Sequence, residues 1–370
     1  MAETLDATTI QLLALIKDLP PAPKAGDVID LDASFKRIMR SRSERRVYST
    51  FTECYHSLID ELTNDYTYES APRGMKIREK LGVTFELTNP RDRLPFIPER
   101  EFGLGYCIAE CVWYLAGSNE TDWIANYAPF WRGISDDGVT ANSAYGARLF
   151  KPHPRIAGNK LASQWKYAID ELKRDPDSRR AVMHVRTPCD SLPGAADKDM
   201  PCTLTLHPFL RDGKLHMVAS MRSSDLILGI AYDIPFFTLL QELMAAELGV
   251  GLGSYIHTSN SLHVYEKHYS MCDAILHGAN NTHHGAPIPP VPSGHFAPVA
   301  GMLDVIQARA RACDDPSKLV AIVNDSPLVG YWDDWARILV MHRARKLKAP
   351  DVFEHLRNSL EFSGYRQFDR

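Results

Sequence analysis

The sequence predicts an α+β fold, because segments typical of strands and of helices are mixed along the chain without a strict alternation of strand, helix and strand. Residues 203–210 and 214–221 alternate polar and apolar side chains on either side of an Arg-Asp-Gly turn at 211–213, which predicts a β-hairpin. Residues 234–249 follow with the composition of a buried helix. With 45% hydrophobic and 24% charged residues, the 370-residue chain has a globular composition.

The first half of the chain shows one strand and several helices. Residues 1–70 have mostly helical spacing, interrupted by a Pro- and Gly-containing run at 19–27. Residues 81–87 predict a strand, and residues 103–117 predict a buried helix that ends at a glycine. Residues 160–174 place their apolar side chains on one face of a further helix.

The second half continues the mixed pattern. The helix at 234–249 has Pro235 in its expected first turn and Gly249 as its expected stop. The other elements expected here are a strand at 181–187, an irregular Pro-rich connector at 286–298, and amphipathic helices at 302–312 and 331–348.

Charge and cysteine usage limit the classes of partner. The formal net charge of −4 gives no general attraction to nucleic acid or to an anionic membrane, so an anionic ligand must be held by a local arginine cluster. The first ten residues are acidic and polar rather than basic and then apolar, and no run reaches the roughly 18 apolar residues of a membrane span. The seven cysteines are odd in number and scattered, which argues against a disulfide framework. We expect a cytoplasmic protein.

Three further features have a simpler interpretation than a binding site. Cys107 and Cys111 lie four residues apart on an expected helix, but no His or Cys pair follows at zinc spacing, so we interpret both as core residues and expect no metal. His283 and His284 lie in a Gly-, Pro- and Asn-containing loop and are interpreted as solvated. The basic run RSRSERR at 40–46 could contact RNA or phosphate, and we interpret it as a solvated helix face.

Cys202 and Asp233 are the two residues whose surroundings suggest chemistry. A cysteine that opens a strand is usually a packing residue, but it becomes a candidate nucleophile where a cation stabilises its thiolate. The second strand of the hairpin returns Arg222 toward Cys202 and could supply that cation. Asp233 lies among the apolar side chains of 228–237, where an unpaired carboxylate costs several kcal/mol. Asp233 therefore requires a partner or a ligand.

Residues 200–269 resemble the central block of the thymidylate synthase family. The family motifs Pro-Cys-His, Gln-Arg-Ser-x-Asp, Leu-Gly-x-Pro-Phe-Asn-Ile and Asp-x-His-x-Tyr have counterparts, without a gap, that begin at Pro201, Met221, Leu228 and Ser261. Upstream, residues 109–117, 143–150 and 175–185 resemble the family's Glu-Leu-Leu-Trp-Phe-Leu-x-Gly helix, its Tyr-Gly motif and its Asp-Pro-x-Ser-Arg-Arg segment. The resemblance covers about residues 75–270.

The resemblance implies a thymidylate synthase-like fold, with a large mixed β-sheet flanked by helices. It divides the chain into a helical N-terminal extension (1–70), a catalytic domain (71–290) and a helical C-terminal extension packed on that domain (291–370). It also implies a homodimer in which Arg179 and Arg180 reach into the partner's site. The implied ligands are a pyrimidine nucleoside monophosphate and 5,10-methylenetetrahydrofolate.

The resemblance also implies a role for each matching site residue. Cys202 would add to C6 of the pyrimidine, which turns C5 into a carbon nucleophile. Glu110 and Tyr145 would serve proton transfer around the ring, Glu110 through water. The implied phosphate ligands are Arg222, Ser223, Arg179 and Arg180, with Arg73 near the place of a missing Arg-Thr-Gly loop. The other implied contacts are His263 and Tyr265 to the ribose 3′-hydroxyl, and Asp225, Gly229 and Trp131 to the pterin of the folate.

Asp233 stands where the family has the asparagine that reads uracil. A carboxylate accepts from the N4 amino group of cytosine and can share a proton with N3, so Asp233 predicts a cytosine base. The alternative is that Asp233 is a helix N-cap just before Pro235. Other departures are Thr203 for a histidine, His207 for a glutamine and Met221 for a glutamine.

These observations predict a cytidylate hydroxymethyltransferase, similar to family members with Asp at the base-reading position. C5 would take the one-carbon unit of the folate, water would add to the exocyclic methylene, and loss of Cys202 would release the 5-hydroxymethyl nucleotide. dCMP is favoured over CMP, because the arginines match those of deoxynucleotide enzymes. The alternatives are a thymidylate synthase that methylates dUMP with a protonated Asp233, and a non-catalytic RNA-binding protein that uses residues 40–46.

Overall fold

The computed structural model describes residues 46–152, 163–192, 198–278 and 288–368. Most of the basic run at 40–46, and the His283-His284 pair, lie outside the described residues. None of the helices in the described ranges is long and apolar enough to cross a membrane.

The described strands form one mixed sheet of eight strands in the order β1-β3-β8-β6-β5-β4, with β2 paired to β3 and β7 to β8. β3 and β8 pair antiparallel, as do β5 and β6, whereas β6 and β8 run parallel. The predicted α+β class is therefore confirmed. The strands are β1 (Arg46–Tyr48), β2 (Tyr68–Ser70), β3 (Ile77–Leu87), β4 (Met183–His184), β5 (Thr203–Arg211), β6 (Lys214–Met221), β7 (Ser224–Asp225) and β8 (Gly251–Tyr265).

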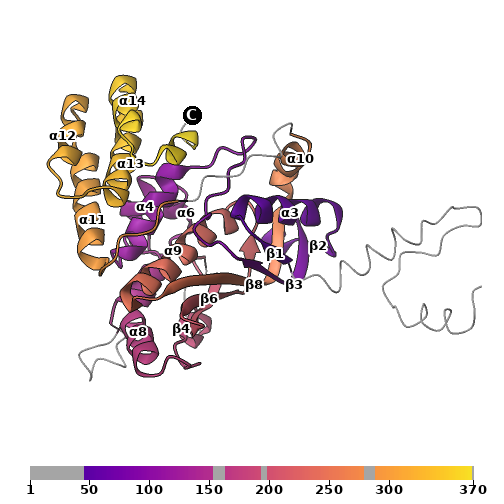
Figure 1. The fold of residues 1–370 in the computed structure, drawn as a ribbon. Helices are drawn as coiled ribbons and strands as arrows, with labels where there is room; N and C mark the ends of the chain where they lie inside the picture. Colours follow the sequence, from indigo (N-terminus) through magenta and orange to yellow (C-terminus); the bar gives the residue numbers. More distant parts are fainter. Residues whose placement is uncertain (1–45, 153–162, 193–197, 279–287, 369–370) are drawn as a thin grey trace, which may run out of the picture. The chain divides into compact units, whose positions relative to one another are not determined.

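Helices flank this sheet (Figure 1). α9 packs on β6 and β8, α3 packs on β3, and α4 lies between α9 and the C-terminal helices α11 and α13. The helices are α3 (Phe51–Asn64), α4 (Leu104–Leu115), α5 (Thr121–Ala125), α6 (Trp131–Ile134), α7 (Tyr145–Phe150), α8 (Gln164–Arg174), α9 (Ile230–Leu248), α10 (Tyr269–His277), α11 (Ala297–Ala312), α12 (Leu319–Asn324), α13 (Tyr331–Lys346) and α14 (Pro350–Asn358).

The predicted hairpin is confirmed as β5 and β6. Its turn residues Asp212 and Gly213 both have positive φ, 49° and 69°, which is the conformation of a type I′ turn. That turn fits the right-handed twist of the flanking strands, so the Arg-Asp-Gly sequence sets the register of the hairpin. The expected strand at 181–187 is shorter than predicted, because β4 pairs with β5 over Met183 and His184 alone.

α9 ends at Gly249 as predicted but begins earlier than predicted. Gly249 has φ 70°, the left-handed conformation that commonly terminates a helix. The helix begins at Ile230, so Pro235 lies in the second turn instead of the first. Proline in a helix interior removes a backbone hydrogen bond. The complete burial of Ile230 and Ala231 offsets that loss and carries the helix through.

Residues 46–70 contribute more than helix to the fold. β1 runs parallel to β3 and β2 runs antiparallel to it, while α3 packs between them on the same sheet. Segments assigned above to an N-terminal extension thus belong to the sheet layer. Two strands of three residues carry too little periodicity to be seen in the sequence.

The C-terminal residues form a group of helices beside α4. α11 and α13 correspond to the two predicted amphipathic helices, and both contact α4. Figure 1 shows α11 to α14 gathered on that side of the sheet domain. Polar bonds reinforce the packing, since the Trp123 indole donates to Asp304 at 2.6 Å and His342 Nε2 lies 3.0 Å from the Asn126 carbonyl oxygen. The C-terminal helices therefore pack against α4 and hydrogen-bond to residues in and next to α5.

Candidate active site

Cys202 and Arg222 lie side by side where the hairpin opens. Thr203 pairs with Met221, and the Arg222 N–H donates a 2.9 Å hydrogen bond to the Cys202 carbonyl. The register shifts between Thr203 and Thr205, and irregularities of this kind re-aim side chains next to active sites. The structure thus brings together the cysteine and the arginine that the hairpin predicted as neighbours.

The backbone just before the cysteine holds the Arg222 guanidinium. Its Nε donates to the Pro201 carbonyl and its Nη2 donates to the Met200 carbonyl, both at 2.9 Å. These two bonds fix the plane of the guanidinium. Neither uses Nη1, so the group keeps donors in a fixed direction for an anionic ligand.

The Cys202 thiol is half-buried, and its pKa is raised. Burial is the largest cause, and the carboxylates of Asp233 and Asp199 add to the rise, whereas Arg222 opposes it. The thiol is therefore protonated in the free protein at neutral pH. Formation of the thiolate requires a nearby group that can take the proton.

A line of hydrogen bonds along α4 ends at Glu110. The Trp131 indole Nε1 donates to the Tyr106 hydroxyl at 3.2 Å, and that hydroxyl donates to the Glu110 carboxyl at 2.6 Å. The Tyr114 hydroxyl is a second donor at 3.5 Å. Glu110 is only 7% exposed, and its burial raises the pKa to about 7 although both hydroxyls lower it. A carboxyl that titrates near neutral pH can both give and accept a proton.

Asp233 lies in the first turn of α9, near Glu110 and Tyr145. The N-cap of the helix is Gly229, and the Asp233 N–H donates to the Gly229 carbonyl at 2.9 Å, so the alternative of Asp233 as the helix cap is wrong. Burial raises the pKa of the Asp233 carboxyl well above its usual range, the Glu110 charge adds to the rise, and a hydrogen bond with Tyr145 lowers it. A charge on Glu110 therefore disfavours ionisation of Asp233.

Tyr145 begins α7 and lies between Asp233 and Tyr114. Its ring stacks on that of Tyr114 with centroids 5.1 Å apart. The next residue, Gly146, touches the α4 backbone: a Cβ there would lie 1.8 Å from the Tyr114 carbonyl oxygen. The Tyr-Gly pair thus lets α7 approach α4 closely enough for Tyr145 to reach the site. Close helix approach at a glycine is the packing role expected of the residue.

Tyr106 and Tyr114 are site residues that the sequence analysis missed. They lie four residues before and four residues after Glu110, which is the spacing that places side chains on one face of a helix. This spacing around a carboxylate was visible in the sequence. Because Tyr114 is buried and Tyr106 is half-buried among apolar residues of α4, both resemble ordinary core positions.

Asp225 and Gly229 form the turn that leads into α9. One oxygen of Asp225 accepts the N–H groups of Ile227 at 2.8 Å and Leu228 at 3.2 Å. A Cβ on Gly229 would lie 2.8 Å from the Asp225 carbonyl oxygen, so the turn requires glycine at that place. The turn leaves Leu228 on the surface, 54% exposed.

His263 and Tyr265 lie at the same end of the sheet as Cys202. Asp225 pairs with His263 in register, and the rings of His263 and Tyr265 are 5.2 Å apart. Burial lowers the pKa of His263 against the opposing effect of Asp225, so the imidazole is neutral near pH 7. The exposed Arg73 lies four residues before Ile77, the partner of Tyr265, in a loop at this end of the sheet.

Arg179 and Arg180 do not lie beside Cys202 within one chain. Both are exposed, and the turn that carries them is held by Arg211, whose guanidinium donates to the Pro176 and Asp177 carbonyls. The backbone of Arg179 lies near the His207 side chain and acts to raise its pKa, against the larger lowering effect of burial. His207 is five strand residues from Cys202, which corresponds to about 16 Å. The backbone that carries these two arginines is therefore remote from Cys202 of its own chain.

Cys107 and Cys111, interpreted above as core residues, are both buried on α4. Within the described ranges, no group of three or more His, Cys, Asp or Glu side chains is arranged to hold a metal ion.

A family model described as thymidylate synthase matches residues 53–285 of the chain. The chain is also similar in sequence to three phage proteins described as deoxyuridylate hydroxymethyltransferases. It is 36% identical to that of Bacillus phage SP01 over 203 residues, which is 54% of this chain and 53% of the relative. Identity is 33% over 205 residues with that of Delftia phage PhiW-14, covering 52% of this chain and 55% of the relative.

The third relative, from Pseudomonas phage M6, is 34% identical over 188 residues, which is 50% of this chain and 51% of the relative. The chain thus spans about half the length of the curated relatives it matches. Among solved structures, it is similar to thermostable thymidylate synthase A from Bacillus subtilis, with a TM-score of 0.51 and 23% identity over 62% of this chain and 84% of that one. That likeness concerns the fold.

Proposed function

Because this chain belongs to the thymidylate synthase family, we propose that it is a one-carbon transferase that hydroxymethylates C5 of a cytidine monophosphate, dCMP in preference to CMP, with 5,10-methylenetetrahydrofolate as cosubstrate. The observation that carries the proposal is the Asp233 carboxyl, which stands near Cys202, Glu110 and Tyr145 without serving as a helix cap. The hydroxymethyl product is supported by the activity named for the three phage relatives.

Cys202 is the proposed nucleophile. Its addition to C6 of the ring makes C5 a carbon nucleophile, which the unmodified ring is not. Arg222 is proposed to bind the 5′-phosphate through the donors it does not spend on Met200 and Pro201, together with Ser223 and Arg73. In this arrangement the Arg222 guanidinium binds the phosphate and also stabilises the Cys202 thiolate.

Asp233 is the proposed reader of the cytosine edge. Its raised pKa supplies a neutral acid whose hydroxyl donates to N3 and whose carbonyl accepts from the N4 amino group. After thiolate addition N3 becomes basic, and the proton of Asp233 can pass to it. Glu110, with a pKa of about 7, would exchange protons around the ring through water, and Tyr145 would orient Asp233. His263 and Tyr265 would hold the ribose 3′-hydroxyl.

Folate would bind over Asp225, Gly229 and Trp131. The fit is supported by exposed apolar side chains next to these residues, Leu228 at 54% and Phe130 at 56%, since a pterin needs a flat apolar support. When bound, the folate supplies the one-carbon unit at the oxidation level of formaldehyde. The protein's part is to hold the nucleotide ring, move protons at Glu110 and admit one water to the new carbon.

The proposed assembly is a homodimer. The face of the sheet opposite α9 carries half-buried side chains, including His207, Phe209, Val218 and Ile256. Arg179 and Arg180 lie at the edge of this face and away from their own Cys202. A second copy packed on this face would bring its two arginines to the first copy's phosphate. Sedimentation at micromolar concentration should therefore report a dimer. Arg179→Ala should weaken nucleotide binding but leave the protein dimeric.

The second candidate function is hydroxymethylation of dUMP, and the names of the phage relatives favour it. A neutral Asp233 could also accept from N3–H of uracil and donate to O4, because a carboxylic acid presents one donor and one acceptor. The raised pKa of Asp233 supports this protonation state. The two candidates differ in which base the site prefers.

The test is mass spectrometry of dCMP, CMP and dUMP, each incubated with the protein and 5,10-methylenetetrahydrofolate. A gain of a hydroxymethyl group on a cytidylate is expected, and Asp233→Asn is expected to shift the preference toward dUMP by at least about tenfold, as for loss of one matched hydrogen-bond pair. Cys202→Ser is the matched control, because it should abolish turnover of every base. A hydroxymethyl group on dUMP alone would establish the second candidate, and a methyl group would contradict both.

A further inference from the structure

We propose that Arg148 is a positioning residue, whose guanidinium fixes the segment 198–202 and through it the geometry of Cys202 and Arg222. The inference rests on the proposed function only in naming the reaction that this geometry serves. Arg148 itself has no contact with Cys202 or Arg222.

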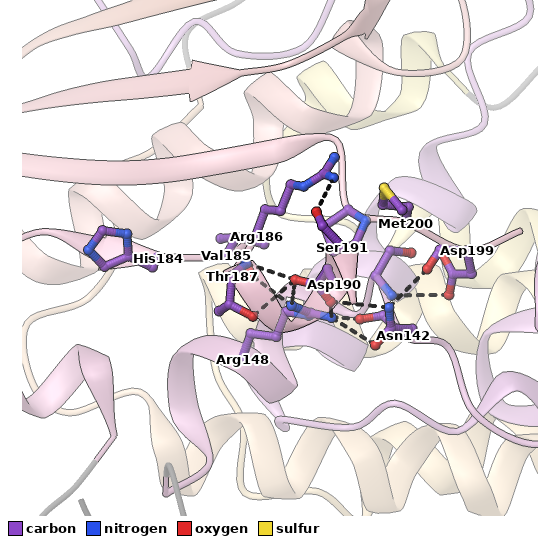
Figure 2. Close-up of polar contacts among 12 residues, drawn as sticks. Asn142, Arg148, His184, Val185, Arg186, Thr187, Asp190, Ser191, Asp199 and Met200 are labelled. Atoms are coloured by element: carbon purple, nitrogen blue, oxygen red, sulfur yellow. Dashed lines mark hydrogen bonds and ion pairs between the residues drawn. The ribbon is translucent and has the colours of Figure 1, made fainter. Parts of the chain in front are cut away.

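The Arg148 guanidinium uses all five of its N–H donors within the protein (Figure 2). Nε donates to the Asn142 carbonyl at 2.8 Å, and Nη2 donates to the Asn142 side-chain oxygen at 2.8 Å. Nη1 donates to the Val185 carbonyl at 2.7 Å. The two remaining donors grip the Asp190 carboxylate at 2.9 and 2.7 Å. The planar guanidinium with its five donors is held in one orientation by these bonds, and the ammonium group of lysine cannot reproduce them.

Asn142 links the Arg148 network to Asp199, in the segment that precedes Cys202. Its side-chain amide donates to the Asp199 carbonyl at 3.0 Å, while the Ser143 N–H donates to the Asp199 carboxylate at 3.0 Å. From the other side, the Asp136 carboxylate accepts the N–H groups of Lys198 at 3.0 Å and Asp199 at 3.1 Å. The backbone at 198–199 is thus held from both sides.

The next two residues carry the carbonyls that orient Arg222. Met200 and Pro201 accept from Nη2 and Nε of that guanidinium, and Cys202 follows directly. The chain of contacts therefore runs from Arg148 through Asn142 and Asp199 to the pair that binds phosphate and attacks the ring. Loosening its first member should cost binding of the anion, because Arg222 would then have to be ordered by the ligand itself.

The test follows alkylation of Cys202 by iodoacetamide, with peptide mapping, in a Cys189→Ser background because Cys189 is exposed. In Arg148→Lys, Cys202 should react severalfold more slowly, because a less ordered Arg222 stabilises the thiolate less. About tenfold more inorganic phosphate should be needed for half-protection, in keeping with the loss of one charge-assisted hydrogen bond. Nucleotide KM should rise more than kcat falls. Arg186→Lys is the matched control, because Arg186 bonds Ser191 in the same loop without touching 198–202.

Asn142→Ala guards against a folding defect, since it cuts the link to Asp199 but leaves the Arg148–Asp190 pair in place. It should reproduce both changes with a melting temperature near that of the wild type. Wild-type alkylation and wild-type phosphate protection in both variants would overturn the inference. If phosphate fails to protect even the wild-type protein, the phosphate site of the proposed function is wrong. In that case the role of Arg148 is judged from the alkylation rate measured in the absence of phosphate.

Discussion

The Tyr106 hydroxyl donates a 2.6 Å hydrogen bond to the Glu110 carboxyl, one turn farther along α4. This bond favours the charged form of Glu110 and so opposes the rise in pKa that burial causes. The hydroxyl itself is held in place by the Trp131 indole. Trp131, in the wall of the proposed folate site, is thus connected through Tyr106 to Glu110, the group proposed to transfer protons.

Replacing Tyr106 by Phe should raise the pKa of Glu110 above its value of about 7, because the charged form loses a donor. The apparent pKa near neutrality in the pH profile of kcat should move to higher pH by about one to two units, the effect of one hydrogen bond to a charged group. Tyr114→Phe is the matched comparison, because its 3.5 Å bond is longer and its effect should be smaller. An equal shift in both variants would contradict the unequal roles assigned here.

Glu110→Gln should change how stability depends on pH. The folded protein holds the Glu110 proton up to a pKa of about 7, whereas the unfolded chain releases it at about 4.3. Between these values the native state binds more protons, so this carboxyl makes the wild-type protein less stable as pH rises, by at most about 1.4 kcal/mol per pH unit. The glutamine variant lacks this loss of stability, so its free energy of unfolding should increase relative to that of the wild type as pH rises between the two pKa values. Urea titrations at several pH values measure the difference, and parallel curves would contradict it.

Asp190→Asn should show the opposite dependence. Although burial opposes the shift, hydrogen bonds from Arg148 and the Thr187 N–H lower the pKa of Asp190 to about 2. The stabilisation is therefore fully present above the unfolded value of about 3.9 and is lost as pH falls toward about 2. The destabilisation caused by the variant should be constant near neutrality and shrink in acid. A difference from the wild type that stays constant into acid would mean that Asp190 contributes shape and not charge.

Gly146→Ala should separate α7 from α4. The new Cβ would meet the Tyr114 carbonyl oxygen at 1.8 Å, which the backbones can relieve only by moving apart. Overpacking of this kind typically costs about 1–3 kcal/mol, and it should also lower kcat because Tyr145 moves with α7. Gly133→Ala is the control, since no atom lies within 4 Å of its Cβ position. Thermal unfolding of both variants, with kcat measured below the transition, decides the matter.

The sequence predicted the parts of the fold that depend on local signals. The hairpin turn at Asp212 and Gly213 and the stop of α9 at Gly249 follow from residues that favour positive φ, so both were visible without a structure. The pairing of β3 with β8 joins residues such as Ile77 and Tyr265, which are about half the chain length apart. No local pattern encodes such a pair, and the family resemblance predicted only a large mixed sheet, without its strand order.

Some of the candidate site could also be predicted from the sequence, and some could not. The proximity of Cys202 and Arg222 follows from hairpin geometry alone. The start of α9 was misplaced because Pro235 suggested a first turn, although burial carries the helix back to Ile230. That error also made Asp233 look like a cap. Tyr106 was overlooked because a tyrosine within an apolar helix looks like a core residue until its hydroxyl is seen to reach Glu110.

α4 carries Glu110 but is covered by α11 and α13, which lie about two hundred residues later in the chain. During synthesis, the apolar face of α4 leaves the ribosome long before its cover exists. The packing around α4 is not complete until residue 346 has emerged. The apolar surface of α4 that these helices cover is therefore exposed on the nascent chain for most of its translation. A chain shortened at α13 would leave this surface of α4 uncovered, and exposed apolar surface of this kind favours aggregation.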